Sequence, residues 1–208
     1  MSKITAIEVQ AKDKTRANLY LDDEFFAGIS IELIIKHQLK KDMEIDEIFL
    51  ADIIFEDDKG KALSKAIKYM GANLKSCSQI REYLRKKEYA PEIIDYVIDK
   101  MKEYKYLDDE AYARAYISAY SGKYGKIKLI QALKSKGITD KTIDIVFAED
   151  DLKMQDSIDK VASKYLKNKE ITQETLIKLN RFLYSRGYEF DQINSYIHTL
   201  KNKQTSTG

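Results

Sequence analysis

A chain of 208 residues with 34% charged residues and one proline can bury a real core, and it favours helices over a β protein punctuated by Pro and Gly. Its single cysteine, Cys77, excludes an internal disulfide and a thiolate metal cluster, and no apolar run follows Met1, so we expect a cytoplasmic protein without a signal peptide or membrane span. The formal net charge of +2 conceals an asymmetry, because residues 1–60 carry 8 Lys and Arg against 14 Asp and Glu. Any nucleic-acid contact is therefore expected in the basic remainder, residues 61–208.

The first 30 residues contain the only convincing β pattern in the chain. Alternating apolar residues predict strands over residues 4–9, 16–21 and 24–29, with turns at Asp13-Lys14 and Asp22-Asp23. Three strands alone are marginally stable, so we expect a cover.

Two helical patterns follow the strands. The first, at residues 31–39, could provide the cover, and the second extends almost unbroken over residues 44–70. Residues 56–60, with the sequence Glu-Asp-Asp-Lys-Gly, interrupt its apolar stripe and form either a linker or an exposed helix turn. We place the boundary of a small β-rich N-terminal domain, residues 1–60, at this interruption.

From residue 61 onward the sequence repeats. Leu84, Leu133 and Leu183 occupy equivalent positions, separated by 49 and 50 residues. Each unit contains three short helical patterns, so the spacing predicts three tandem three-helix repeats in an elongated, curved array. The predicted fold is mainly α behind the β-rich domain, with repeats at residues 61–107, 108–151 and 152–202 and a disordered tail at residues 203–208.

Helix-capping signals support this division. Caps or first-turn residues precede several predicted helices: Asp108, Thr139, Thr172, Pro91 and the capping box Ser76-Cys77-Ser78-Gln79. Gly137 and Gly187 stand where a helix end favours a left-handed residue. Repeat 1 has Glu88 at this position. A non-Gly residue in this conformation costs roughly 1 kcal/mol, so we expect the helix of repeat 1 to end differently.

The most informative stretch extends from Leu107 to Ile138. It predicts two helices, whose expected apolar stripes are Tyr112, Ala115, Tyr116 and Ala119 for the first and Ile127, Ile130 and Leu133 for the second. Residues 121–138 contain five lysines and no Asp or Glu. Unopposed positive charge on a helix–break–helix unit suits a phosphate-rich or acidic partner better than a small substrate.

This stretch resembles the signature of the RecX family of recombinase regulators. The family pattern is Leu-x-Asp, an aromatic-Ala pair, a Gly-Lys-rich break and Leu-x-x-Lys-Gly-Ile. The matching residues are Leu107-Asp108-Asp109, Tyr112-Ala113, Gly122-Lys123 through Gly125-Lys126, and Leu133-Lys134-Ser135-Lys136-Gly137-Ile138. Tyr112 stands where the family more often has Phe, and Asn73 stands where Arg is expected.

The resemblance implies both a fold and a function. The fold would be three tandem three-helix repeats, here behind the β-containing N-terminal extension of longer family members. The function would be that of a regulatory protein that binds the RecA recombinase filament in its helical groove. Such a protein would inhibit ATP turnover, filament growth and DNA strand exchange in recombination and the SOS response.

The candidate contact residues are cations and one tyrosine of the repeats. Three positions after each anchor leucine stand Lys87, Lys136 and Arg186, which would form a row of cations on one face. The alternative is that they only stabilise helix C-termini, by roughly 0.3–1 kcal/mol each. Tyr124 lies beside the lysine cluster and off the apolar stripe, whereas most other tyrosines are expected in the core. The full set of candidates for contact with RecA or DNA is Arg85, Lys86, Lys87, Arg114, Lys123, Tyr124, Lys126, Lys128, Lys134, Lys136, Arg181 and Arg186.

Catalysis finds little support in the sequence. His37 and His198 have no Cys near either of them, and no phosphate-binding G-x-x-x-x-G-K-[ST] loop occurs, so we expect no enzyme activity, cofactor or metal. Residues 122–125 match a nucleic-acid-clamping GXXG loop, but no sheet pattern flanks them.

Two other hypotheses stay open. One is a nucleic-acid-binding helical module that acts independently of RecA. The other is a scaffold for an unrelated protein partner. We expect a monomer that binds single- or double-stranded DNA weakly.

Overall fold

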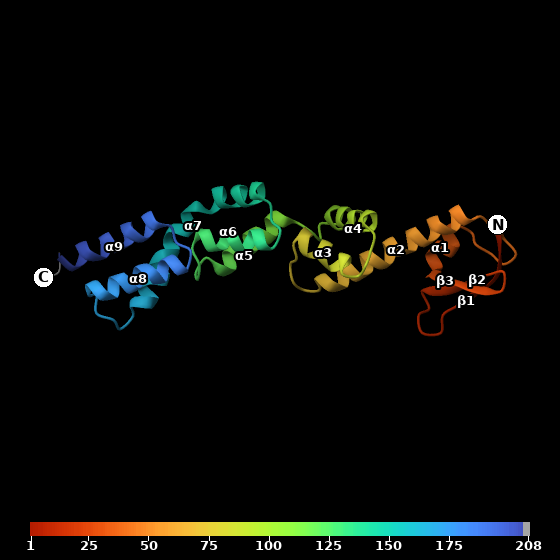
Figure 1. Cartoon of the computed structure of the whole chain (residues 1–208), viewed down its shortest axis with the longest axis horizontal. Coiled ribbons are helices and arrows are strands. Elements are labelled where there is room, and N and C mark those ends of the chain that lie inside the picture. Colours follow the sequence, from red (N-terminus) through yellow and green to blue (C-terminus); the bar gives the residue numbers. More distant parts are fainter. Residues whose placement is uncertain (206–208) are drawn as a thin grey trace. The chain divides into compact units, whose positions relative to one another are not determined.

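The computed structural model describes residues 1–205, and for residues 150–156 and 203–205 it describes the backbone only. The described chain forms two compact units: Met1–Ala72 with Ile80–Tyr104, and Asn73–Gln79 with the residues from Lys105 onward. The predicted fold class is confirmed, because a small antiparallel sheet precedes helices grouped in threes (Figure 1).

The N-terminal sheet has the strand order β3-β2-β1-β4. The predicted strands are confirmed as β1 (Ser2–Val9), β2 (Arg16–Leu21) and β3 (Glu24–Ser30), and a short fourth strand, β4 (Glu44–Ile45), was not predicted. Between β2 and β3, Asp22 and Asp23 both have positive φ, 50° and 66°, which is the geometry of a two-residue hairpin turn.

Two helices complete the core of this sheet. Helix α1 (Ile31–Lys36) begins at the N-cap Ser30, and helix α2 (Glu47–Met70) begins at the N-cap Asp46. Buried residues of the sheet pack with Leu50 and Ile53 of α2. Helix α2 continues through residues 56–60, so the linker alternative is wrong and the helix-turn alternative is confirmed. That turn is not fully exposed, because the side chain of Asp57 is buried.

Most helices of the repeats are short, but two long helices each extend from one predicted domain into the next. The remaining helices are α3 (Cys77–Arg85), α4 (Pro91–Glu103), α5 (Asp109–Tyr120), α6 (Lys126–Ser135), α7 (Asp140–Leu166), α8 (Gln173–Ser185) and α9 (Phe190–Thr205). Helix α7 extends without a break past the boundary proposed at residues 151/152, a position whose side chains lie outside the described residues. Helix α9 extends to Thr205, and residues 206–208 of the predicted tail also lie outside the described part.

The predicted helix starts are confirmed. The side chains of Asp108, Thr139 and Thr172 each accept a hydrogen bond from an amide of the first turn that follows. The capping box is reciprocal: the Ser76 amide donates to Gln79 Oε1 at 3.1 Å, and the Gln79 amide donates to Ser76 Oγ at 3.2 Å. Such caps satisfy amide groups that have no partner within their helix.

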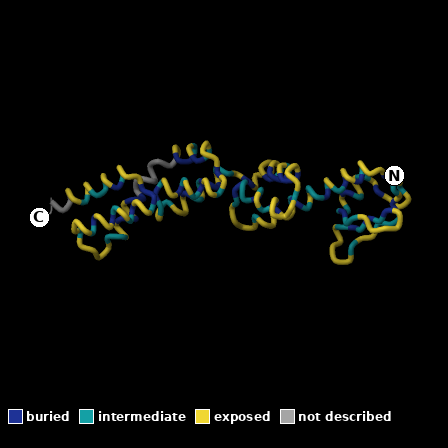
Figure 2. The backbone as a smooth tube through the Cα atoms, in the orientation of Figure 1, coloured by how far each residue is buried: buried dark blue, intermediate teal, exposed yellow. Residues whose placement is uncertain are grey.

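The predicted apolar stripes are right at some positions and wrong at others, and buried and exposed positions alternate along the helices (Figure 2). Tyr112 and Leu133 are buried as predicted, and Tyr116 and Ile130 pack against the same core. In α5 the buried residues are Tyr112, Ala113 and Ile117, while Ala115 and Ala119 are exposed. In α6 the buried residues are Leu129 and Leu133, whereas Ile127 is 40% exposed. The period was right, but the choice between neighbouring apolar residues depends on which side the next helix covers.

The second helices of the three repeats end in the same way. Gly137 and Gly187 have φ values of +75° and +84°, as predicted, but Glu88 also adopts the left-handed conformation, with φ +62°. The expectation that repeat 1 ends this helix differently is therefore wrong. The same hydrogen bond closes each end, from Tyr89, Ile138 and Tyr188 to the anchor leucines Leu84, Leu133 and Leu183. Glu88 is exposed, so its Cβ has room where a buried residue's would not.

Candidate protein and nucleic-acid interface

The Gly-Lys-rich break is a packing junction between α6 and α8. The Gly125 amide donates to the Arg186 carbonyl at 2.9 Å, and the Ile127 amide donates to the Gly187 carbonyl at 3.1 Å. A Cβ on Gly187 would lie 2.5 Å from the backbone N of Lys128, and a Cβ on Gly125 would lie 2.6 Å from the backbone N of Tyr188. Both glycines are therefore required by the close approach of two backbones. We call this contact the α6–α8 junction.

A related contact joins the start of α3 to the end of α6 within the second unit. The Ser76 hydroxyl donates to the Lys136 carbonyl at 2.6 Å, and the Cys77 amide donates to Asp109 Oδ1 at 2.9 Å. The side chain of Ser78 occupies the space that a Cβ on Gly137 would need. Cys77 is buried in this contact.

The α6–α8 junction gathers two predicted contact cations around the ring of a third candidate, Tyr124. Lys128 Nζ lies 4.9 Å and Arg186 Cζ lies 5.7 Å from the centroid of the Tyr124 ring. Lys123 Nζ lies 5.9 Å from the neighbouring Tyr120 ring. We call Lys123, Tyr124, Lys128 and Arg186 the Tyr124 cluster. Each contact has cation–π geometry, and no ion pair with an acid is recorded for these cations among the described residues.

Tyr124 ends a row of four tyrosines. The ring centroids of Tyr112, Tyr116, Tyr120 and Tyr124 follow one another at 6.4, 4.6 and 6.3 Å. Burial, followed by the neighbouring phenols, raises the pKa of Tyr112 and of Tyr116, so both stay neutral at physiological pH. Tyr112 belongs to the core and Tyr120 is 36% exposed, so the row leads from the core to the surface.

Several other candidates are engaged in ion pairs. Arg85 and Lys86 both pair with Glu82, and Lys134 pairs with Asp140 at 2.6 Å. Arg114 pairs with Glu110 on its own helix and with Glu149 of α7 at 3.0 Å. These pairs are largely exposed, so each contributes little to stability, but a partner would have to displace the acid before it could contact the cation.

The remaining candidates have other surroundings. Lys126 Nζ lies 5.5 Å from the Phe147 ring, and Lys136 contributes its carbonyl to the contact with Ser76. Lys87 and Arg181 are exposed. That these cations form one row on a common face stays a prediction.

Among the residues whose side chains the structure describes, Asp57 of α2 is the best-buried charged group, and the sequence did not predict its burial. Its side chain is 1% exposed and accepts hydrogen bonds from Arg16 Nη1 at 3.2 Å and Nη2 at 2.8 Å, while Lys61 Nζ lies 2.8 Å from Oδ2. The Ser30 amide, at the end of β3, donates to Oδ1 at 2.9 Å. Burial would raise the pKa of Asp57, but these hydrogen bonds outweigh burial and hold the pKa below its ordinary value.

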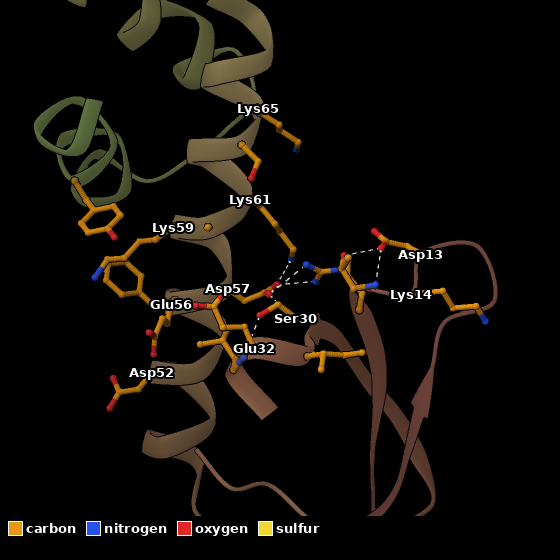
Figure 3. A pocket seen from close by; sticks show the side chains of 18 residues that line it. Asp13, Lys14, Ser30, Glu32, Asp52, Glu56, Asp57, Lys59, Lys61 and Lys65 are labelled. Atoms are coloured by element: carbon orange, nitrogen blue, oxygen red, sulfur yellow. Dashed lines mark hydrogen bonds and ion pairs between the residues drawn. The ribbon is translucent and has the colours of Figure 1, made fainter. Parts of the chain in front are cut away.

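This Asp57 network lies in a cleft of about 1050 Å³ (Figure 3). The lining comes from the Asp13–Arg16 turn, α1, α2 and Tyr96 of α4, and both signs of charge occur in it. Because Asp57 has strong partners on β2, β3 and α2 itself, we interpret it as a structural tie between sheet and helix. The only signal in the sequence was the spacing of Asp57 and Lys61 by four residues.

The described residues contain no group of three or more His, Cys, Asp or Glu that could hold a metal ion. His37 contacts Glu56 at 2.9 Å and packs edge-on against Phe49, so it belongs to the N-terminal unit's packing. Within the part of the chain that the structure describes, no helix is long and apolar enough to span a membrane.

Comparison with known proteins gives a consistent result along the chain. Residues 2–46 match the model of the regulatory protein RecX N-terminal domain. Residues 62–101, 108–146 and 153–197 match the first, second and third three-helix domains of RecX.

Curated relatives and a solved structure agree with these models. A regulatory protein RecX of Clostridium tetani is 36% identical over 205 residues, covering 96% of this chain and 95% of that protein. The regulatory protein RecX of Bacillus subtilis is 30% identical over 210 residues, covering 97% and 78%. A crystal structure of regulatory protein RecX superposes with a TM-score of 0.73 at 25% identity, over 93% of this chain and 98% of the other.

Proposed function

The chain belongs to the RecX family of regulatory proteins, and on that premise we propose that it binds the RecA recombinase filament and inhibits its activity. Members of this family are regulators and not enzymes. The proposed action is cytoplasmic: the repeats contact the groove of the filament and oppose ATP turnover, filament growth and strand exchange.

The Tyr124 cluster is the observation that best supports a contact surface in the repeats. Its cations lie over aromatic rings instead of carboxylates. An acidic partner can therefore bind them without first breaking an ion pair. The α6–α8 junction fixes the backbone beneath the cluster through two hydrogen bonds, so little conformational entropy is lost on binding.

We infer that the partner of the Tyr124 cluster is an acidic protein surface on the filament. Tyr124 is only partly exposed, and the core of the second repeat, Lys128 and Arg186 all lie around its ring, so the ring is a poor platform for a base. A binder of single strands needs exposed aromatic rings on which successive bases stack. Cations without an exposed ring for stacking suit the carboxylates of a folded protein surface better than they suit the bases of a single strand.

The test is a triple variant, Lys123→Ala, Lys126→Ala and Lys128→Ala, in RecA ATPase and strand-exchange assays. We expect inhibition to weaken by about tenfold or more, because several charge contacts are lost together. A matched control replaces three exposed lysines of the N-terminal unit, Lys12, Lys40 and Lys41, and should inhibit like the parent protein. Circular dichroism checks that both variants fold.

A second candidate function is a nucleic-acid module that acts without RecA, and Tyr120 of the tyrosine row, which is 36% exposed, favours it. In that case the triple variant would lose affinity for all bare DNA sequences, with a salt slope lower by about one per lost phosphate contact. Full inhibition by the triple variant together with abolished DNA binding would assign the Tyr124 cluster to DNA. No effect of the parent protein on RecA at any ratio would remove the leading proposal.

A further inference from the structure

The second helices of repeats 2 and 3 carry the same short sequence. With a shift of 50 residues, Ile127-Lys128-Leu129 of α6 matches Ile177-Lys178-Leu179 of α8. Further along the two helices, the matched positions are Leu133 with Leu183, Ser135 with Ser185 and Gly137 with Gly187. In repeat 1 the corresponding residues are Ser78-Gln79-Ile80, so the Ile-Lys pair belongs to repeats 2 and 3 alone among the three.

Packing explains most of these repeated positions. The leucines are buried in the cores of their repeats, and the glycines adopt the left-handed conformation. The hydroxyls of Ser135 and Ser185 each donate to the carbonyl three residues earlier, both at 2.7 Å. These residues would recur in any two repeats that share a fold.

Packing does not explain the isoleucines. Ile127 is 40% exposed and Ile177 is 47% exposed, although a lysine or glutamate would favour the helix more strongly. Each isoleucine precedes an exposed lysine, so an apolar side chain and a cation lie side by side at the start of both helices. A single exposed isoleucine is ordinary, but the same exposed pair at equivalent positions in two repeats requires an explanation.

We propose that Ile127–Lys128 and Ile177–Lys178 are two copies of one docking face, and that each takes an acidic protein segment with an exposed apolar side chain. The occupant is a partner that presents this segment repeatedly, as neighbouring subunits of one polymer do. The proposal rests on the proposed function, in which the polymer is the recombinase filament. The proposal adds which residues make the contact, and that the same contact is made once by repeat 2 and once by repeat 3.

The charge around the two faces favours an acidic occupant. Helix α6 contains no Asp or Glu, and in α8 the only acid is Glu174, which pairs with Lys178 at 2.6 Å. Glu174 lies one turn before Lys178, so it occupies the place that an acid of the partner would take. The second face should therefore bind more weakly than the first, because the partner's acid has to displace Glu174.

The two faces are held at a fixed spacing. The Ile127 amide donates to the Gly187 carbonyl, which places the first face at the C-terminal end of α8, whereas Ile177 lies near its N-terminal end. Eight residues of α8 separate Ser185, at the end of the helix, from Ile177, which corresponds to roughly 12 Å at about 1.5 Å per residue. A rigid pair of equivalent faces gains most from a partner with two copies of the segment, because the second contact is then intramolecular.

Nucleic acid is a poorer occupant for these faces. Each face offers one aliphatic side chain and one ammonium group, whereas bases stack on aromatic rings. An aliphatic anchor contributes by the removal of apolar surface from water, and a protein segment can supply the matching side chain.

The experiment uses Ile127→Ala, Ile177→Ala and the double variant in the full chain. Binding is measured to assembled recombinase filaments and, in parallel, to unassembled recombinase protomers. The control is Ile48→Ala in α2, because Ile48 is 77% exposed and lies outside both faces. Alanine keeps the helices intact, and thermal unfolding verifies that each variant is folded.

We expect each single variant to lose about tenfold or more in affinity for the filament, because the bivalent contact becomes monovalent. On unassembled protomers each single variant should lose less affinity than on the filament, since one of two separate faces remains, and Ile127→Ala should lose more than Ile177→Ala because the second face is the weaker one. The double variant should lose affinity for both forms, and Ile48→Ala for neither.

Each other outcome overturns the proposal in a recognisable way. A double variant that binds the filament like the parent protein shows that the faces are not used, while the proposed function stands. Loss from only one single variant shows that the faces are not a pair. If the variants lose as much affinity for bare single-stranded DNA as for the filament, the faces bind nucleic acid. A parent protein that binds neither form of the recombinase overturns the proposed function and the paired faces together.

Discussion

Two regions of this protein hold separate elements together by different means. In the N-terminal unit the Asp57 network joins β2, β3 and α2 through a buried carboxylate and two cations. At the α6–α8 junction the elements are joined by backbone hydrogen bonds across two glycines. The first region depends on the charge of the Asp57 side chain. The second depends on two positions that carry no side chain, Gly125 and Gly187.

The difference also decides what the nearby cations can do. Arg16 and Lys61 are engaged by Asp57, so they are unavailable to a partner. Lys128 and Arg186 lie at a junction that needs no carboxylate, and they lie over an aromatic ring instead. A count of basic residues therefore says little about a binding surface until the acids that neutralise them are known.

The largest expected effect comes from placing a side chain in the α6–α8 junction. Gly187→Val should destabilise the second unit by about 4 kcal/mol, because a β-branched residue is strained at φ +84° and its Cβ would meet the Lys128 backbone. Gly137→Val should cost less, because the atoms it meets first belong to the side chain of Ser78. Urea unfolding of both variants measures the difference, and equal midpoints would contradict the steric explanation.

Removing the buried carboxylate should have the next largest effect. Asp57→Ala should destabilise the N-terminal unit by about 3 kcal/mol, because Arg16 and Lys61 lose their buried partner. Asp52→Ala, on an exposed position of the same helix, is the matched control and should change stability by less than about 0.5 kcal/mol. Hydrogen exchange of the β2 and β3 amides follows the unit directly, and protection equal to that of the parent protein would show that the tie is dispensable.

Acid should affect the two regions differently. The pKa of Asp57 is lower in the folded chain than its ordinary value of 3.8, so its stabilising contribution is complete above that value. The contribution is lost as the pH falls through the lower, folded pKa. The α6–α8 junction has no titrating group in its backbone contacts. We therefore expect the protection of the β2 and β3 amides, corrected for the intrinsic exchange rate at each pH, to fall between neutral pH and pH 3 in the parent protein and to fall less in Asp57→Asn.

Local signals in the sequence predicted much of the fold. The alternation of residues 16–21, the N-caps and Gly137 and Gly187 each act within a few residues, and their outcomes agree with the structure. The family signature extended this local agreement to the whole chain.

The failures have a common cause in contacts between distant residues. The sequence places Asp57 in a linker or an exposed helix turn and does not indicate its burial, because its partner Arg16 lies 41 residues away in the sequence. Ile127 was assigned to the core, because a period of 3.6 residues does not say which side the next repeat covers. The Gly-Lys-rich break was correctly located, but its glycines could be explained only once Arg186 and Gly187 were placed against it.

A smaller effect is expected where the junction meets the Tyr124 cluster. Lys128→Ala removes the hydrogen bond from Nζ to the Ser185 carbonyl, 3.3 Å long, and the contact with the Tyr124 ring. Because both contacts are exposed and the backbone bonds remain, the loss should be about 0.5–1 kcal/mol. Thermal unfolding measures it. A loss as large as that of Gly187→Val would show that side chains, and not backbones, hold the junction.

The smallest effect should come from Glu88, the residue of repeat 1 that corresponds to Gly137 and Gly187. Glu88→Gly relieves about 1 kcal/mol of strain at φ +62° but adds about 0.5–1 kcal/mol of conformational entropy to the unfolded chain. The two terms nearly cancel, so stability should rise by less than about 0.5 kcal/mol. The reciprocal variant, Gly187→Glu, carries the same strain and adds the collision with Lys128, so it should cost several times more. The difference between the two variants in the free energy of unfolding, measured in urea, reports the cost of the collision with α6 alone. Similar small effects in both variants would mean that the α6–α8 junction can open without loss of stability.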